Sequence, residues 1–299
     1  MKPIRLTSPA PCEIFVERGV LKKAGALLSP PNGSARRFLW LCRLPDSAPA
    51  PSSLLASLTR AGHTVVRMQD DAPTPVADAI LAVGDEGELG AALVFAEGRD
   101  LPVALVPTTF PAQLTFPFDE RVGIVLCDPD LPPESEVDER RGIAELIRYA
   151  VGFDRTAFDL LYTDFDRAVL IRRYLTVRAD LFAADKTELL YRLGMPIGLA
   201  VAEATEWQDF DVADALAIGL AASTRYALKT GFCRQDFLSD LVGLLTYRGL
   251  PHSALLSDAD LCAALKKEGA TTHLSLPRRM GECGLLDVDP EALTGLLPA

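Results

Sequence analysis

Gly142-Ile-Ala-Glu-Leu-Ile-Arg-Tyr149 lies near the middle of the 299-residue chain. Apolar residues recur at helical spacing in and just after it, at positions 143, 146, 147, 150 and 151. The segment is therefore predicted to be a helix with one buried face. Glu145 stands about 200° around such a helix from Ile143 and is predicted to point away from that face. On spacing alone, Glu145 is expected to be a solvated side chain.

The residues before this helix alternate between short apolar runs and helical stretches. Strands are predicted at 13–17, 37–42, 63–67, 79–83, 102–106 and 123–127, and helices at 20–28, at about 52–61 and up to Glu97. Because strands that alternate with helices form a parallel sheet covered on both faces, we predict a Rossmann-like α/β domain for residues 1–130.

From Asp138 onward the periodicity is that of helices alone. The predicted helices lie at about 138–151, 155–163, 166–184, 188–206 and 212–230, with shorter ones up to the C-terminus. An all-α domain is therefore predicted for residues 131–299, with a cleft between the two domains.

Composition excludes several classes of partner. The net charge of −11 argues against a nucleic acid held by phosphate neutralisation. No apolar run reaches the length of a membrane span, and the N-terminus lacks the apolar core of a signal peptide. Six scattered cysteines without a CxxC motif suit a reducing compartment, so a cytoplasmic location is expected. The three histidines limit both acid–base and zinc chemistry.

A glycine-rich turn follows the predicted strand 79–83. Its glycines, Gly84, Gly87 and Gly90, would let backbone N–H groups and a helix N-terminus approach a pyrophosphate. The spacing is not GxGxxG, and three carboxylates surround the turn: Asp85, Glu86 and Glu88. Because these charges repel an anion, both a plain strand-to-helix turn and a dinucleotide site stay open here.

The octet 142–149 resembles the Gly-Leu-Ala-Glu-Val-Ile-Lys-Tyr segment of 3-dehydroquinate synthases and related sugar-phosphate cyclases. Val106-Pro-Thr-Thr109 resembles the family's Val-Pro-Thr-Thr, and the second half of the chain is similar to the family's helical domain. The resemblance implies NAD as a cofactor and a catalytic zinc with Glu145 as a ligand. The candidate NAD contacts are Gly84, Gly87, Thr108 and Thr109.

The sequence departs from the family at several functional positions. The loop after Thr109 is much shorter and lacks both substrate lysines, and Thr115 stands where the family has an aspartate. The positions of three family histidines are taken by Met195, Leu199 and Val212. Because a catalytic zinc requires three protein ligands, Glu145 is predicted to be only a vestigial ligand and zinc is not expected.

Other matches give candidate catalytic residues. Arg178 stands where the family has a substrate-side lysine, Asp185-Lys-Thr-Glu188 with Arg192 resembles its Asp-Glu-x-Glu-x-x-x-Arg motif, and Lys266-Lys267 resembles part of its Asp-Lys-Lys motif. The candidates are Arg178, Glu188, Arg192, Lys266 and Lys267. The same residues also fit ordinary roles, since carboxylates at helical spacing screen an arginine and lysines favour a helix C-terminus.

These observations lead to competing hypotheses about function. The first is a degenerate homologue, or pseudoenzyme, without zinc-dependent cyclase activity, which acts as a regulatory or small-molecule-binding protein with weak or absent NAD binding. The second is a metal-independent lyase or cyclase with a rebuilt acid–base site in the interdomain cleft, and the third is an ordinary 3-dehydroquinate synthase. The expected partners are a second copy in a homodimer or an active relative, and a small molecule in that cleft.

Overall fold

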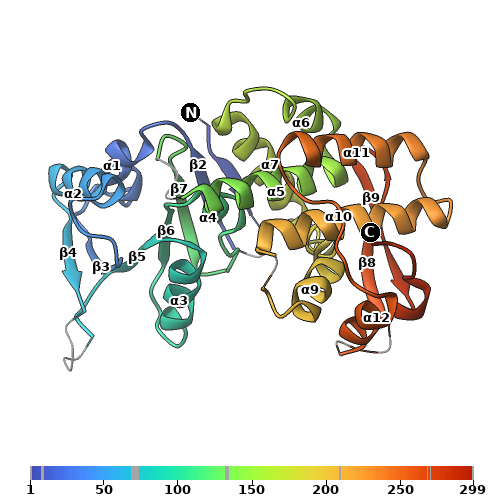
Figure 1. Ribbon diagram of the computed structural model, residues 1–299. Helices are drawn as coiled ribbons and strands as arrows, with labels where there is room; N and C mark the ends of the chain where they lie inside the picture. The colour runs from blue at the N-terminus through green and yellow to red at the C-terminus, as the bar shows by residue number, and fades with distance from the viewer. Residues whose placement is uncertain are drawn as a thin grey trace. The chain divides into compact units, whose positions relative to one another are not determined.

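The computed structural model describes residues 2–7, 10–68, 74–131, 135–208, 210–267, 269 and 271–297. The chain divides into two compact units. In Figure 1 the colour runs along the chain by residue number, from blue at the N-terminus to red at the C-terminus. Unit 1 consists of Met1–Asp138 and Arg167–Ala183, and unit 2 of Glu139–Asp166 and Ala184–Ala299. The chain therefore leaves unit 1, returns to it for one helix, and leaves again. The division predicted at residue 130 does not include this return.

Unit 1 is built on a seven-stranded sheet with the order β1-β2-β7-β6-β5-β3-β4. The strands are β1 (Ile4–Leu6), β2 (Cys12–Val16), β3 (Arg37–Leu41), β4 (Thr64–Arg67), β5 (Ala79–Gly84), β6 (Val103–Pro107) and β7 (Val122–Cys127). Only the β1–β2 pair is antiparallel within this sheet. Every residue of β5 and β6 is buried, as expected for central parallel strands covered on both faces.

The helices of unit 1 cover both faces of this sheet. They are η1 (Val20–Lys23), α1 (Ala24–Leu28), α2 (Pro49–Arg60), α3 (Glu86–Ala96), α4 (Phe110–Thr115) and α7 (Arg167–Ala183). In Figure 1, α1 and α2 lie above the sheet and α3 lies below it. The core under η1, α1 and α2 includes Phe38, Trp40 and Leu81. The later segment α7 contacts β1, β2 and α4, which explains its place in unit 1.

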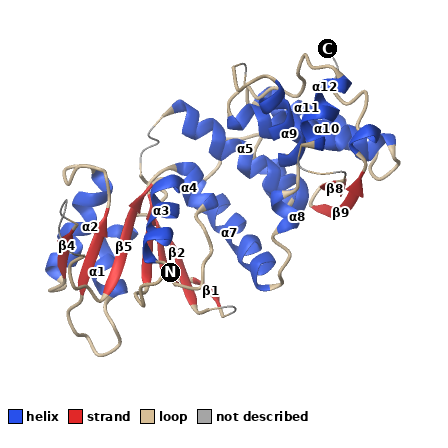
Figure 2. Cartoon of the chain, turned by 90° about the horizontal axis from the view of Figure 1, so that it is seen from below, coloured by secondary structure: helices blue, strands red, loops and turns tan. Residues whose placement is uncertain are grey.

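Unit 2 is mostly helical (Figure 2). Its helices are α5 (Glu136–Phe153), which begins at the end of the first segment of unit 1, α6 (Arg155–Leu160), α8 (Glu188–Tyr191), α9 (Met195–Ala204), α10 (Val212–Lys229), α11 (Gln235–Tyr247), α12 (Asp258–Lys266) and η2 (Pro290–Ala292). The long helix α10 packs against α9, α11 and the strand β8 (Thr272–Arg279). Among the helices in the described ranges, we find none that combines the length and apolar character of a membrane span.

The predicted α/β first half and largely helical second half are both present. Two details of the second half need correction. An antiparallel hairpin of β8 and β9 (Glu282–Val288) stands where helices alone were expected. The helix predicted at 188–206 is two helices, because Gly194 has a φ of 77° and α9 starts afresh at Met195, with Pro196 in its first turn.

Candidate functional site

The turn between β5 and α3 is closed by the chain's own carboxylates. Asp85 is the N-cap of α3, and its Oδ1 accepts a hydrogen bond of 2.8 Å from the backbone N–H of Glu88. In return, Glu88 Oε2 accepts one of 3.1 Å from the backbone N–H of Asp85. A Cβ at Gly84 would lie 1.8 Å from Glu88 Oε2, so a side chain there would displace the Glu88 carboxylate from its capping position. This capping box satisfies N–H groups that a phosphate would otherwise bind.

The two threonines after β6 lie beside this turn. The backbone N–H of Thr108 donates to Gly84 O at 2.9 Å, which joins the two loops. Thr109 is the N-cap of α4, where its Oγ1 accepts from the Ala112 N–H at 3.2 Å and donates to Glu86 Oε2 at 3.4 Å. Thr108 Oγ1 is buried and has no hydrogen-bond partner within the described ranges. Gly84, Thr108 and Thr109, three of the candidate cofactor contacts, therefore lie together, and the carboxylate of Glu86 joins them.

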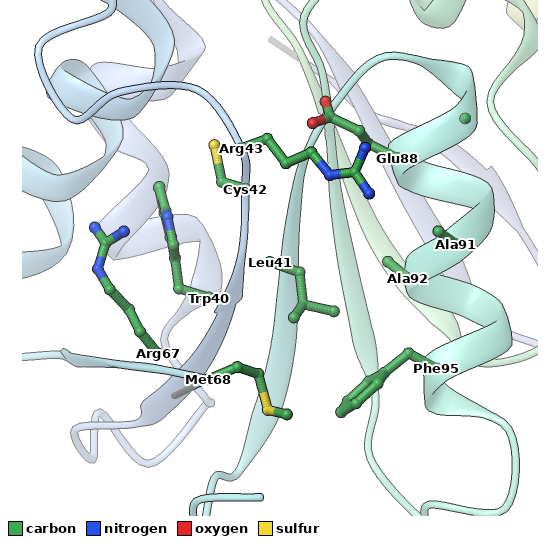
Figure 3. Close-up of a pocket in the computed structure, with 11 residues that line it drawn as sticks. Trp40, Leu41, Cys42, Arg43, Arg67, Met68, Glu88, Ala91, Ala92 and Phe95 are labelled. Carbon is green, nitrogen blue, oxygen red and sulfur yellow. The ribbon is translucent and has the colours of Figure 1, made fainter. Parts of the chain in front are cut away.

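Beside this turn, unit 1 contains a pocket of about 480 Å³, drawn in Figure 3. Its lining comes from the carboxyl ends of β3 and β4 and from α3: Trp40, Leu41, Cys42, Arg43, Arg67, Met68, Gly87, Glu88, Ala91, Ala92 and Phe95. Of the predicted cofactor contacts, only Gly87 lines it. Burial raises the pKa of the Cys42 thiol, so this thiol stays protonated at neutral pH and is a poor nucleophile.

Arg178 has contacts that belong to the fold of unit 1. Its Nη1 donates to Leu114 O at 3.0 Å and its Nη2 to Thr115 O at 3.4 Å, so it binds carbonyls at the C-terminus of α4. The guanidinium also lies over the ring of Phe118, 4.2 Å from its centroid. Arg178 is only 2% exposed. These contacts hold the shortened loop after Thr109 against α7.

In unit 2, Glu145 lies on the central part of α5. The side chain is buried and accepts a hydrogen bond of 2.5 Å from Arg148 Nη2, one turn further along the helix. The expectation of a solvated Glu145 is therefore wrong, because the side chain is withdrawn from water and neutralised by an arginine. Both groups are almost fully buried, with side-chain exposures of 10% and 2%.

The positions that resemble zinc ligands do not supply a donor set. Met195 and Leu199 lie on α9, and Val212 is the first residue of α10 with 38% exposure. Within the described ranges, no group of three or more histidine, cysteine, aspartate or glutamate side chains could hold a metal ion. The start of α10 is instead linked to α5 by Arg140, which donates to Asp211 at 2.9 Å and to Asp214 at 2.6 Å.

The remaining candidate residues of unit 2 make surface or backbone contacts. Glu188 is exposed in the first turn of α8, and Arg192 follows that helix and accepts a backbone hydrogen bond from Ser275 at 3.1 Å. Lys266 pairs with Glu291 at 2.7 Å and Lys267 with Glu203 at 3.6 Å. In the part of unit 2 that the structure describes, no ion pair joins any two of these candidates: Glu188, Arg192, Lys266 and Lys267.

Among curated proteins, this chain is similar in sequence to 3-dehydroquinate synthases. No family model matches. The 3-dehydroquinate synthase of Synechococcus sp. is 28% identical over 189 residues, 56% of this chain and 51% of that enzyme. The corresponding enzyme of Pelobacter propionicus is 25% identical over 255 residues, 72% of this chain and 69% of that enzyme. The chain thus spans only about half the length of the first of these relatives.

The solved structures that share the fold of this chain include sugar-phosphate cyclases. A 2-deoxy-scyllo-inosose synthase complexed with carbaglucose-6-phosphate, NAD+ and Co2+ superposes with a TM-score of 0.78 at 16% identity, covering 99% of both chains. A 2-epi-5-epi-valiolone synthase from Streptomyces hygroscopicus subsp. jinggangensis, with NAD+ and Zn2+ bound, gives 0.72 at 19% identity and covers 94% of both. The chain is thus similar in sequence to 3-dehydroquinate synthases and shares the fold of sugar-phosphate cyclases.

For this dehydroquinate synthase-like chain, sequence reasoning missed two features. The capping box carried a signal, since an N-cap residue followed three positions later by glutamate is typical of a helix start. The pocket lined by Trp40, Arg43 and Phe95 carried a weaker signal, because ligands bind beyond the carboxyl ends of parallel strands.

Proposed function

We propose that this chain does not carry out the NAD- and zinc-dependent cyclisation of its family and acts instead as a regulatory, small-molecule-binding protein. The observation that carries the proposal is the α3 N-terminus, where the carboxylates of Asp85 and Glu88 cap the helix. Glu86, which accepts from Thr109, adds a third negative charge to the same loop.

The α3 N-terminus does not fit a dinucleotide. The two sugar-phosphate cyclases described above were solved with NAD+ bound. A pyrophosphate placed on α3 would displace Glu88 from Asp85 N–H and would face carboxylates at close range. The carboxylates of Asp85 and Glu88 would repel the pyrophosphate. They also already compensate the positive end of the α3 dipole, which would otherwise favour the anion. NAD binding is therefore proposed to be weak or absent.

The proposed loss of zinc rests on α5, α9 and α10. Glu145 is neutralised by Arg148, while Met195, Leu199 and Val212 offer no nitrogen ligand at the positions that resemble the family's histidines. A lone carboxylate does not make the three-ligand site that a catalytic zinc needs. We expect no stoichiometric zinc or cobalt after dialysis. A stoichiometric metal that Glu145→Ala abolishes would contradict this.

Titration calorimetry with NAD tests the proposal. The wild-type chain is expected to bind NAD weakly or not at all, and the triple variant Asp85→Asn, Glu86→Gln, Glu88→Gln is expected to bind it more tightly. The variant keeps a capping side chain at each end of the box while it removes the charges. Asp258→Asn with Asp260→Asn, in the first turn of α12, is the matched control and should change nothing. A micromolar or tighter dissociation constant for the wild type would overturn the proposal.

Activity gives a second test of the proposed function. A bacterial strain that lacks its own 3-dehydroquinate synthase needs aromatic supplements, and expression of this chain alone is expected to leave that need unchanged. The expectation rests on the separate losses of the metal site, of the acid–base histidine and of the substrate lysines. Growth without supplements would favour the rebuilt enzyme instead, and Arg192 and Lys267 would be the first residues to substitute.

A further inference from the structure

The pocket of unit 1 has an apolar wall and a polar end. In Figure 3, Met68 and Phe95 lie at one end, Leu41 and Ala92 in the middle, and Arg43 and Glu88 at the other end. The volume of about 480 Å³ is in the range of small-molecule sites, which combine apolar walls with a few polar groups.

The apolar wall favours a flat, aromatic group. Phe95 offers a ring and Met68 a thioether, and both make favourable contacts with aromatic rings. Met68 is 41% exposed, which is high for a methionine beside other apolar side chains. The small side chains of Ala91 and Ala92 leave the space between α3 and the end of β3 open.

The polar end presents two charges of opposite sign, Arg43 and Glu88. Arg67, the other arginine of the lining, is already paired with Asp46 at 2.6 Å and lies 5.6 Å from the ring centroid of Trp40. Arg43 has no hydrogen-bond or ion-pair partner among the residues that the structure describes, and its side chain extends towards α3 beside Glu88 in Figure 3. Glu88 Oε2 accepts a hydrogen bond from the Asp85 N–H, and the other carboxylate oxygen, Oε1, can accept from a ligand.

These charges select among ligands. A dianionic or more highly charged ligand would be attracted by Arg43 but repelled by Glu88 and the neighbouring Asp85. A ligand without charge would leave both groups without a partner when it displaced their water. A zwitterion matches both groups, since its anion pairs with the guanidinium and its cation with the carboxylate.

We propose that this pocket binds a zwitterionic α-amino acid with an aromatic side chain. The ligand carboxylate accepts from Arg43, its ammonium group donates to Glu88, and its ring packs between Leu41, Met68 and Phe95. This assignment rests on the proposed function in one respect, namely that the pocket is not occupied by a dinucleotide. It deepens that function by giving the chemical class of the small molecule.

Tryptophan fluorescence provides a direct test. The chain has two tryptophans, and Trp207→Phe leaves Trp40, which lines the pocket, as the reporter. Titration of this variant with L-phenylalanine is expected to change the Trp40 emission with saturation, and calorimetry on the wild type should give the same dissociation constant. N-acetyl-L-phenylalanine, which lacks the cation, and L-phenylalaninamide, which lacks the carboxylate, are expected to bind about tenfold more weakly or worse.

Three variants locate the site. Arg43→Gln and Glu88→Gln should each weaken L-phenylalanine binding by about tenfold or more, and glutamine at position 88 still serves the capping box. Ala91→Phe fills the pocket from the exposed side of α3 and should abolish binding without changing a charge. Arg234→Gln removes an exposed arginine of unit 2 and is the matched control.

The result that overturns the proposal is no saturable change with L-phenylalanine at millimolar concentration, or binding that Arg43→Gln and Ala91→Phe leave unchanged. Either failure is distinct from failure of the proposed function, which NAD titration of the same wild-type sample measures separately. Tight NAD binding overturns the proposed function, whereas a negative L-phenylalanine titration with no NAD binding overturns only the ligand assignment.

Discussion

At the scale of the residue, Glu145 and Arg148 form a buried ion pair on α5. The two buried charges lie 2.5 Å apart within one helix and compensate each other. Removal of only one partner leaves the other charge in the interior of unit 2. Glu145→Ala is therefore expected to lower the free energy of unfolding by about 3–5 kcal/mol, measured by urea denaturation.

Two controls separate the pair from a general effect of lost charge. The double variant Glu145→Leu with Arg148→Met should recover most of the stability, because no unpaired charge remains buried. Asp159→Ala breaks the exposed pair with Arg155 and should cost about 0.5 kcal/mol or less. A loss for Glu145→Ala no larger than that for Asp159→Ala would contradict the structural role of the pair.

Cys12 gives a prediction about alkaline pH. Burial raises the pKa of this thiol from 9.0 to about 12 in the folded chain. The folded state therefore keeps a proton that the unfolded state releases above pH 9.0, so this contribution to stability is complete below pH 9.0 and is lost as pH rises towards 12. Cys12→Ala should make the decline of unfolding free energy between these values shallower, by at most about 1.4 kcal/mol per pH unit. Urea denaturation that gives the wild type and Cys12→Ala the same decline of unfolding free energy with pH would disprove this.

At the scale of the element, glycines allow α9 and α10 to approach closely. A Cβ at Gly198 would lie 2.1 Å from Ala215 O, a backbone atom that does not move without the helix. Gly198→Ala is therefore expected to destabilise the protein by about 1–3 kcal/mol or more. Gly90→Ala on α3 is the matched control, because nothing lies within 4 Å of its added Cβ, and it should stabilise by about 0.5–1 kcal/mol. Thermal unfolding that ranks the two variants in the opposite order would refute the argument.

The sequence predicted elements well where one periodicity dominates. The parallel strands of unit 1 are apolar runs between helices, so all six were predicted near their observed bounds. The hairpin of β8 and β9 was missed because Pro277 lies inside β8, and proline argues against a strand. The register shifts between Pro277 and Arg279, which is how the ladder accommodates the proline.

The candidate site was predictable in part. The parallel sheet brings Gly84 and Thr109 to the same edge, and the negative charge around them was visible in the sequence. The partner of Glu145 was not predicted, because helical spacing alone gave Glu145 a solvated face, whereas packing in unit 2 covers that face as well. The pocket was missed because Arg43 and Phe95 are far apart in the sequence and meet only through the sheet and α3.

At the scale of the whole molecule, α7 makes unit 1 discontinuous. Leu170, Ile171 and Tyr174 are buried on α7, and Arg178 binds the end of α4. A fragment of residues 1–138 lacks this helix and is expected to bind a hydrophobic dye and to unfold without cooperativity. The same fragment with residues 167–183 joined by a Gly/Ser linker should unfold cooperatively. Cooperative unfolding of the shorter fragment, without dye binding, would rule this dependence out.

The late position of α7 also affects how the protein matures on the ribosome. All seven strands of the unit 1 sheet have been synthesised by residue 138, but residues 167–183 follow only after part of unit 2. At ordinary elongation rates, residues 139–183 take roughly 2–9 s to synthesise. During that interval the nascent sheet exposes the apolar surface that α7 later covers, and chaperones bind such surfaces. Substitutions on α7 are therefore expected to reduce the yield of protein in cells more than they reduce the stability of the molecules that finish folding.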